Sequence, residues 1–176
     1  MNTELLQQLL SKVRDGDVSV EEAVQKLRLL PFEDMGFARI DHHRQIRCGF
    51  PEVIYCPGKT TEQIVAIFER LAETGNNVLA SRAAPEAYEA LQLTGKYPDL
   101  QYDALARCLT LVRKPCAPSK RHIGVITAGT ADLAIAREAK ITAEIMGWRT
   151  ELLADVGVAG LHRLLRNLEV VQRATV

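Results

Sequence analysis

The chain has 176 residues, of which 47% are hydrophobic and 5% aromatic, and 22 Lys and Arg residues balance 22 Asp and Glu residues. This size allows one ordinary domain with a buried core, or two small ones. Zero net charge without a long basic run, together with few aromatic rings, argues against a nucleic-acid binder and against a membrane-surface binder. No segment has the roughly 20 apolar residues of a membrane helix, and the N-terminus lacks a signal-peptide pattern. We therefore expect a soluble cytoplasmic protein with no nucleic-acid or membrane partner.

The first half of the chain predicts two helices and then alternating short strands and helices. Apolar residues at helical spacing over 5–13 predict a helix that ends near Gly16. Ser19 and Glu22 form a capping box that opens a second helix, and Pro31 ends it. The following elements are strands over 37–40 and 52–56 joined by a turn at 48–51, a helix over 61–74 opened by Thr60 and Gln63 and stopped by Gly75, a strand over 77–82, a helix over 84–93 and one or two strands within 100–113.

The pattern changes after residues 114–121, whose two prolines, one serine and three basic residues are typical of a linker. Beyond it, two apolar strands at 122–127 and 149–154 alternate with helices at 131–146 and about 159–166. This alternation predicts a βαβ unit with parallel strands and a right-handed crossover. We therefore expect an α/β protein with a domain boundary near residue 119.

The two predicted domains differ in completeness. Residues 1–119 form a small N-terminal α/β domain with two leading helices, and residues 120–176 form the start of a second domain that ends in the first residues of a third strand. Two parallel strands do not make a stable sheet. We therefore expect either a fragment of a longer protein, which we favour, or a domain completed by another copy.

Small residues after each strand of the βαβ unit predict a site for a small anionic ligand. A helix N-terminus presents unpaired N–H groups, and open α/β sheets bind ligands at the carboxyl ends of their strands. Gly129 permits an unusual backbone angle, and Asp132 either caps the helix or binds a sugar hydroxyl. The alternative is that Thr130 or Asp132 is only a cap, and spacing alone does not decide. Arg163 lies within reach of a phosphate, but a solvated surface arginine is the simpler account. The expected nucleotide-binding residues are Thr127, Ala128, Gly129, Thr130 and Asp132 in the first turn and Asp155, Gly157, Val158 and Ala159 in the second.

A second group of chemically active residue types occupies the N-terminal half. His42, His43, Arg44 and Cys48 lie close in sequence, but adjacent histidines on a strand point to opposite faces and cannot share a metal ion. His42 and Cys48 can in principle form a base–nucleophile pair, whereas a polar, half-exposed hairpin is the interpretation we prefer. The "CPGKTT" stretch is not a phosphate loop, because Val53 stands where that motif needs its first glycine. We predict no metal site.

The stretch "HIGVITAGTADLAIAREAKITAEIMGWRTELLADVGVAGLHRLL", residues 122–165, resembles the start of the PurE-like domain of aminoimidazole ribonucleotide carboxylases. Together with "GFARIDHHRQIRCGFPEVIYCPGKTTEQI", residues 36–64, it more closely resembles the pyridinium-biscarboxylic acid mononucleotide synthases, which begin nickel-pincer cofactor synthesis for lactate racemase. This resemblance, from about residue 35 to the end, implies a flavodoxin-like α/β domain and a homo-oligomer, an octamer in the full-length family. It also implies carboxylation of the nicotinate ring of nicotinic acid adenine dinucleotide by carbon dioxide or bicarbonate, and hydrolysis of its phosphoanhydride with loss of AMP. Mg²⁺ is compatible with such a substrate.

The resemblance also sets limits on function. Purine carboxylases carry a glycine-serine-x-serine-aspartate pattern where residues 128–132 read "AGTAD", so only Asp132 is kept and purine carboxylation is disfavoured. The family's nucleophilic cysteine and an acidic residue after the third strand have no counterpart up to Val176, so the resemblance places the catalytic residues beyond it and implies that these residues alone do not catalyse. An aminoimidazole ribonucleotide carboxylase or mutase and a non-catalytic regulatory protein of the same fold remain the alternatives.

Overall fold

The computed structural model describes residues 3–28, 33–42, 44, 48–115 and 119–176. They belong to two compact units, Met1–Glu52 and Val53–Val176. The predicted boundary near residue 119 lies inside the second unit and stays a prediction. Residues 116–118 of the predicted linker lie outside the described residues. None of the helices in the described part of the chain has the length and apolar character to cross a membrane.

The first unit contains two helices and a small antiparallel ladder, α1 (Thr3–Arg14), α2 (Val20–Arg28), β1 (Glu33–Asp34) and β2 (Arg39–Ile40). The predicted capping box is confirmed, because the Glu22 N–H donates to Ser19 Oγ at 3.0 Å and the Ser19 N–H to Glu22 Oε2 at 3.3 Å. Pro31, the predicted end of α2, lies outside the described residues.

The predicted hairpin between 37–40 and 52–56 is wrong. β2 pairs with β1, with Glu33 opposite Ile40, whereas β3 (Val53–Tyr55) belongs to the second unit. The cause is a tight turn at Gly36, which has a φ of 81° and donates its N–H to Asp34 Oδ1 at 2.8 Å. This turn folds the chain back before the predicted partner is reached, and a two-residue strand leaves no alternating pattern to predict it from.

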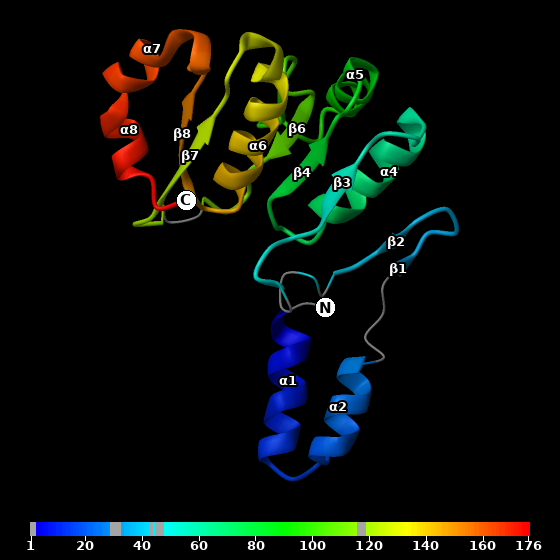
Figure 1. Cartoon of the computed structure of the whole chain (residues 1–176). Coiled ribbons are helices and arrows are strands. Elements are labelled where there is room, and N and C mark those ends of the chain that lie inside the picture. Colours follow the sequence, from blue (N-terminus) through cyan, green and yellow to red (C-terminus); the bar gives the residue numbers. More distant parts are fainter. Residues whose placement is uncertain (1–2, 29–32, 43, 45–47, 116–118) are drawn as a thin grey trace. The chain divides into compact units, whose positions relative to one another are not determined.

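The second unit begins with a four-stranded mixed sheet in the order β3-β4-β6-β5 (Figure 1). β3 and β4 (Val78–Ser81) are parallel, while β6 (Cys108–Leu111) is antiparallel to β4 and to β5 (Gln101–Asp103). Helices α4 (Thr61–Ala72) and α5 (Pro85–Leu93) join the strands. Every residue of β4 is buried, as are Phe68 and Leu91 of the helices, so the core lies where these helices meet the sheet. The capping box at Thr60 and Gln63 is confirmed.

The βαβ unit follows as predicted, with β7 (His122–Ile126) parallel to β8 (Arg149–Leu153). A 3₁₀ turn at Thr130–Asp132 leads into α6 (Leu133–Ile145), and a second one at Val158–Gly160 leads into α7 (Leu161–Arg166). α6 contacts β7 and β8 and also β4 and β6 of the first sheet, and Figure 1 shows it between the two sheets. The contact to the first sheet is apolar, because Ile145 packs with Leu79 and Cys108. The α/β fold class is therefore confirmed.

The last residues return to the edge of β7 opposite β8. After α8 (Leu168–Arg173), the Thr175 N–H donates to His122 O at 2.7 Å and the Gly124 N–H donates to Val176 O at 2.8 Å. A Cβ at Gly124 would lie 3.1 Å from the Cβ of Ala174, so glycine at this position permits the close approach. Most of 168–176 is thus helical, and only its end makes the sheet-type bonds expected of a third strand.

Candidate nucleotide site

Thr127 joins the turn that follows β7 to the turn that follows β8. Its N–H donates to Leu153 O at 3.0 Å, and its hydroxyl donates to Gly129 O at 3.1 Å and accepts from the Asp155 N–H at 3.4 Å. The residue is 7% exposed. A hydroxyl has one hydrogen to donate, and that of Thr127 goes to Gly129 O, so Thr127 ties the two turns together.

Two backbone hydrogen bonds fasten the turns further. The Val156 N–H donates to Thr127 O at 3.1 Å and the Gly157 N–H donates to Ala128 O at 2.9 Å. A Cβ on Gly157 would lie 2.7 Å from Ala128 O, a separation that real Cβ atoms essentially never show. Gly157 has an ordinary φ of −65°, so the position requires glycine for this close approach and not for its backbone angle. The two turns that the sequence singled out are therefore side by side.

The start of the helix beyond β7 is open. Gly129 has a φ of −135° and a ψ of 171°, so the prediction of an unusual backbone angle is wrong, but no atom lies within 4 Å of a Cβ built there. Neither the N-cap of the 3₁₀ turn, Gly129, nor that of α6, Asp132, makes a side-chain capping bond. The first N–H groups of such a helix have no partner within it and carry partial positive charge. Thr130 and Asp132 are exposed, and the Asp132 carboxylate makes no capping hydrogen bond although Asp132 occupies the N-cap position of α6.

The second turn contains a charged pair that sequence reasoning interpreted differently. Asp155 has a φ of 60°, in the left-handed region, and its carboxylate forms an ion pair with Arg163. The guanidinium lies over Gly160, where a Cβ would be 2.3 Å from Arg163 Nε. That Nε is buried and has no hydrogen-bond partner in the structure. Arg163 is therefore part of the site and not a freely solvated arginine.

The remaining predicted residues lie at the solvent-exposed surface of the two turns. Val158 is 97% exposed, Ala159 and Ala128 are exposed, and His162 on α7 is exposed as well. An apolar side chain as exposed as Val158 has no role in the core, so it is available for contact with a ligand or another chain.

His42, Arg44 and Cys48, the described members of the polar group in the first unit, do not lie on the predicted hairpin. His42 Nε2 lies 2.9 Å from Glu33 Oε2, and its Nδ1 is buried without a partner. Arg44 and Cys48 are exposed, and His43 lies outside the described residues. Among the residues that the structure describes, His42 pairs with a carboxylate and not with Cys48, so the base–nucleophile pair is not formed.

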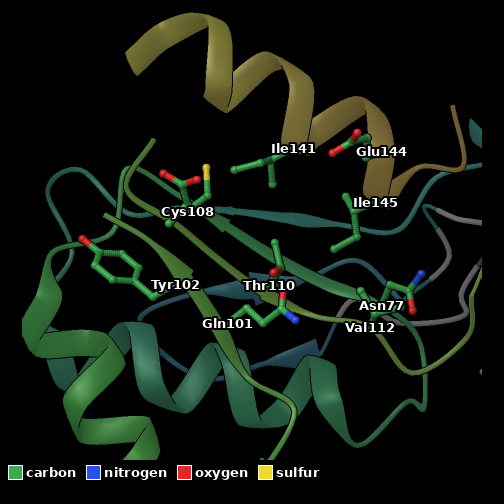
Figure 2. A pocket seen from close by; sticks show the side chains of 10 residues that line it. Asn77, Gln101, Tyr102, Cys108, Thr110, Val112, Ile141, Glu144 and Ile145 are labelled. Atoms are coloured by element: carbon green, nitrogen blue, oxygen red, sulfur yellow. The ribbon is translucent and has the colours of Figure 1, made fainter. Parts of the chain in front are cut away.

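A cavity of about 360 Å³ lies under α6, against β5 and β6 (Figure 2). Several of its polar groups already bond to the protein: the Asn77 side chain to the backbone of Arg113 and Lys114, the Tyr102 hydroxyl to Ala83 O, and the Cys108 thiol to Ala106 O. None of the predicted nucleotide-binding residues lines it. A cavity whose polar groups are used internally offers few contacts to orient a ligand.

Cys56 and Cys108 of the second unit are poor nucleophiles. Cys56 and Cys108 are free and buried, and burial raises the pKa of each thiol to about 11. Cys48 is free and exposed, and Cys116 lies outside the described residues. The described part of the chain holds no group of three or more His, Cys, Asp or Glu side chains arranged for a metal ion.

The fold and the two joined turns define an α/β protein with a parallel βαβ unit. Residues 32–114 match the family model described as LarB/PurE-like N-terminal domain, and this match supports the LarB family for the chain. The chain is also similar to the uncharacterized protein MJ0165 of Methanocaldococcus jannaschii, with 34% identity over 171 residues. The similarity covers 93% of this chain and 66% of that relative, so the chain spans slightly less than two thirds of the relative's length.

Proposed function

We propose that these residues belong to a LarB-family carboxylase that carboxylates the nicotinate ring of nicotinic acid adenine dinucleotide, and that the turns at 127–132 and 155–160 bind the nucleotide. The family match suggests carboxylase-type chemistry. The observation that carries the assignment of the site is the open, uncapped start of the helix at Gly129, held against the second turn by Thr127. Backbone N–H groups at a helix start are suited to phosphate oxygens.

Each group of the site has a distinct role in this proposal. The N–H groups after Gly129 and the Thr130 hydroxyl donate to phosphate oxygens, while the exposed Asp132 carboxylate accepts from a sugar hydroxyl. The Asp155 carboxylate is neutralised by Arg163, so it does not repel an anionic ligand. Mg²⁺, which binds phosphates together with one or two carboxylates, would find Asp132 as its ligand here.

The chemical steps divide between binding and covalent catalysis. In the proposed reaction a thiolate adds to the pyridinium ring, and the neighbouring ring carbon, made electron-rich, attacks carbon dioxide. Loss of the proton from that carbon to a base and departure of the thiolate then restore the aromatic ring, and hydrolysis of the phosphoanhydride by water releases AMP. Cys56 and Cys108 cannot supply that thiolate near neutral pH, because the pKa of each is raised to about 11. The role that we propose for the two turns is positioning of the nucleotide. A homo-oligomer in the cytoplasm is part of the same proposal.

The binding role is tested by equilibrium titration of the chain with nicotinic acid adenine dinucleotide, comparing wild type with Gly129→Val. An extended φ of −135° suits valine, and the space around a Cβ is empty, so the variant folds but fills the place of the ligand. We expect at least about a tenfold loss of affinity, the cost of one charge-assisted hydrogen bond. Ala139→Val, on the exposed face of α6, is the matched control and binds as wild type does. Equal binding by Gly129→Val would place the nucleotide elsewhere.

The reaction is tested separately with the full-length protein, nicotinic acid adenine dinucleotide and bicarbonate, by measuring released AMP. Absence of AMP, or turnover of aminoimidazole ribonucleotide in its place, would overturn the proposed substrate. The missing serines at Gly129 and Ala131 favour the first substrate.

A further inference from the structure

Three basic side chains gather at one end of the four-stranded sheet. Lys59 follows β3, Arg82 follows β4, and Arg107 precedes β6, whose start lies beside the end of β4 because the two strands are antiparallel. The Arg107 guanidinium donates to Ala83 O at 3.3 Å and to Arg82 O at 3.4 Å, and the Ala83 N–H donates to Arg107 O at 2.7 Å. Residues far apart in the sequence thus form one basic cluster, which consists of Lys59, Arg82 and Arg107.

The cluster carries more positive charge than its neighbours balance. Arg82 pairs with Glu138 at 3.2 Å and lies over the ring of Tyr55 at 5.7 Å. Lys59 Nζ donates to the Tyr55 carbonyl at 2.6 Å. Lys59 and Arg107 bond only to backbone carbonyls among the residues that the structure describes, and neither pairs with a carboxylate there. Tyr55 links Lys59 to Arg82, because the Lys59 ammonium bonds to its carbonyl and the Arg82 guanidinium lies over its ring, while Arg107 bonds to the carbonyl of Arg82.

The backbone under the two arginines is unusual. Arg82 and Arg107 each have a φ of 54°, a left-handed conformation that only glycine, asparagine and aspartate adopt readily. Such a conformation costs an ordinary side chain about 1–2 kcal/mol. A fold that needed only this backbone angle would be served better by glycine or asparagine, and strained residues of this kind concentrate at functional sites. The two guanidinium groups make contacts that glycine cannot, since that of Arg107 bonds to Ala83 O and Arg82 O and that of Arg82 pairs with Glu138.

The basic cluster lies at the same end of the second unit as the nucleotide turns. Arg82, after β4, pairs with Glu138 in the first half of α6, while Asn77, before β4, lines the same cavity as Glu144 near the end of α6. β4 and α6 therefore run in opposite directions, and the end of β4 faces the half of α6 that starts at the nucleotide turn (Figure 1). The start of α4 adds less positive charge to this end of the unit, because the Glu62 N–H in its first turn already bonds to the Glu62 carboxylate. This bond lowers the pKa of that carboxyl group.

We propose that Lys59, Arg82 and Arg107 bind a phosphate group, at a place distinct from the turns at 127–132 and 155–160. Two cations without carboxylate partners in the described part of the chain, and a third that pairs with Glu138 beside an exposed aromatic ring, provide the positive charge and the N–H donors that a phosphate dianion needs. Tyr55 is 52% exposed, so its edge is available to a group attached to that phosphate. The proposal does not depend on the identity of the nucleotide at the turns.

The test is titration of the ¹⁵N-labelled 176-residue chain with inorganic phosphate and with AMP, followed through backbone amide resonances. We expect shifts at Lys59, Ala83 and Arg107, and a loss of affinity of about tenfold or more in Lys59→Gln and in Arg107→Asn. Asparagine accepts the left-handed backbone, so Arg107→Asn removes the charge without adding strain. Lys120→Gln removes one exposed charge elsewhere and leaves the affinity unchanged.

The outcomes separate this site from the proposed function. Shifts confined to residues 128–132, or an equal loss of affinity in Lys120→Gln, would overturn the phosphate site while leaving the nucleotide turns untouched. Gly129→Val provides the reverse control, because it blocks the turns and leaves phosphate binding at the basic cluster intact. Tighter binding of AMP than of inorganic phosphate identifies a nucleotide as the source of the phosphate, and equal binding identifies a free anion.

Discussion

Gly157 and Gly129 stand in the two facing turns, and the structure predicts opposite consequences for alanine at each. In Gly157→Ala the new Cβ would lie 2.7 Å from Ala128 O and 3.2 Å from its Cβ, both of them parts of the facing turn. A backbone oxygen cannot rotate away as a flexible side chain can, so the two turns have to separate. In Gly129→Ala the new Cβ meets no atom within 4 Å, and the φ of −135° is ordinary for alanine.

The expected magnitudes follow from these contacts. Separating the turns weakens the Gly157 N–H bond to Ala128 O, which contributes about 1 kcal/mol, and overpacking adds about 1–3 kcal/mol. We therefore expect Gly157→Ala to lower the free energy of unfolding by about 2–4 kcal/mol. Gly129→Ala is expected to raise it by about 0.4–1 kcal/mol, because alanine restricts the unfolded chain.

Urea unfolding followed by tryptophan fluorescence reports on the second unit, which contains both substitutions, because the only tryptophan of the chain, Trp148, lies between α6 and β8. The m-value is compared with wild type, so that a change in midpoint reports stability. Equal stability of the two variants, or a larger loss in Gly129→Ala, would show that the turns are not in contact as described, and the proposed site would lose its basis.

Three other substitutions test separate parts of the second unit. Burial raises the pKa of Cys56 and Cys108 from 9.0 to about 11, so each thiol contributes stability that is present below pH 9 and lost as the pH rises to about 11. When the free energy of unfolding is measured at both ends of this range, it should fall less in the double variant Cys56→Ala/Cys108→Ala than in wild type. Thr60→Ala removes the bond to the Gln63 N–H and is expected to cost about 1 kcal/mol, whereas Thr61→Ala beside it keeps the cap and costs less by the same thermal unfolding measurement. Asp155→Asn tolerates a φ of 60° and should be near neutral, while Asp155→Ala should cost about 1 kcal/mol more; equal stability of these two variants would contradict the left-handed backbone.

Local signals predicted the parts of the fold that depend on neighbouring residues. Both capping boxes are formed, because each needs only two side chains three positions apart and the backbone between them. The βαβ unit is predictable for a similar reason: two short apolar runs flank the helix α6, which ends at Ile145, two residues before Gly147 with its φ of 89°. The strand–helix–strand order supplies the crossover that two parallel strands need, and hence predicts their parallel pairing.

Long-range pairing was not predictable from the same signals. The partner of β2 depends on a turn at Gly36 and not on any alternation of apolar residues, so the hairpin prediction chose the wrong strand. In the site, the two turns were found because each combines small residues with the end of a strand. Arg163 was assigned to solvent because its contacts, Asp155 and Gly160, are defined only once the chain folds back. The sequence does not predict the basic cluster, because its three residues are far apart in the chain and come together only through the order of the strands in the sheet.

Because α6 packs on both sheets, the geometry of the nucleotide turn depends on residues far from it. Ile145 anchors the end of the helix against Leu79 of β4, and Glu138 fixes its first half to Arg82. Arg137, beside Glu138, pairs with Asp103 at the end of β5. The position of the helix start, whose N–H groups form the proposed phosphate cradle, is therefore set by contacts to the sheet that contains the basic cluster as well as by β7. The first sheet thus has a physical role in the site, since it supplies the rigid surface that orients α6.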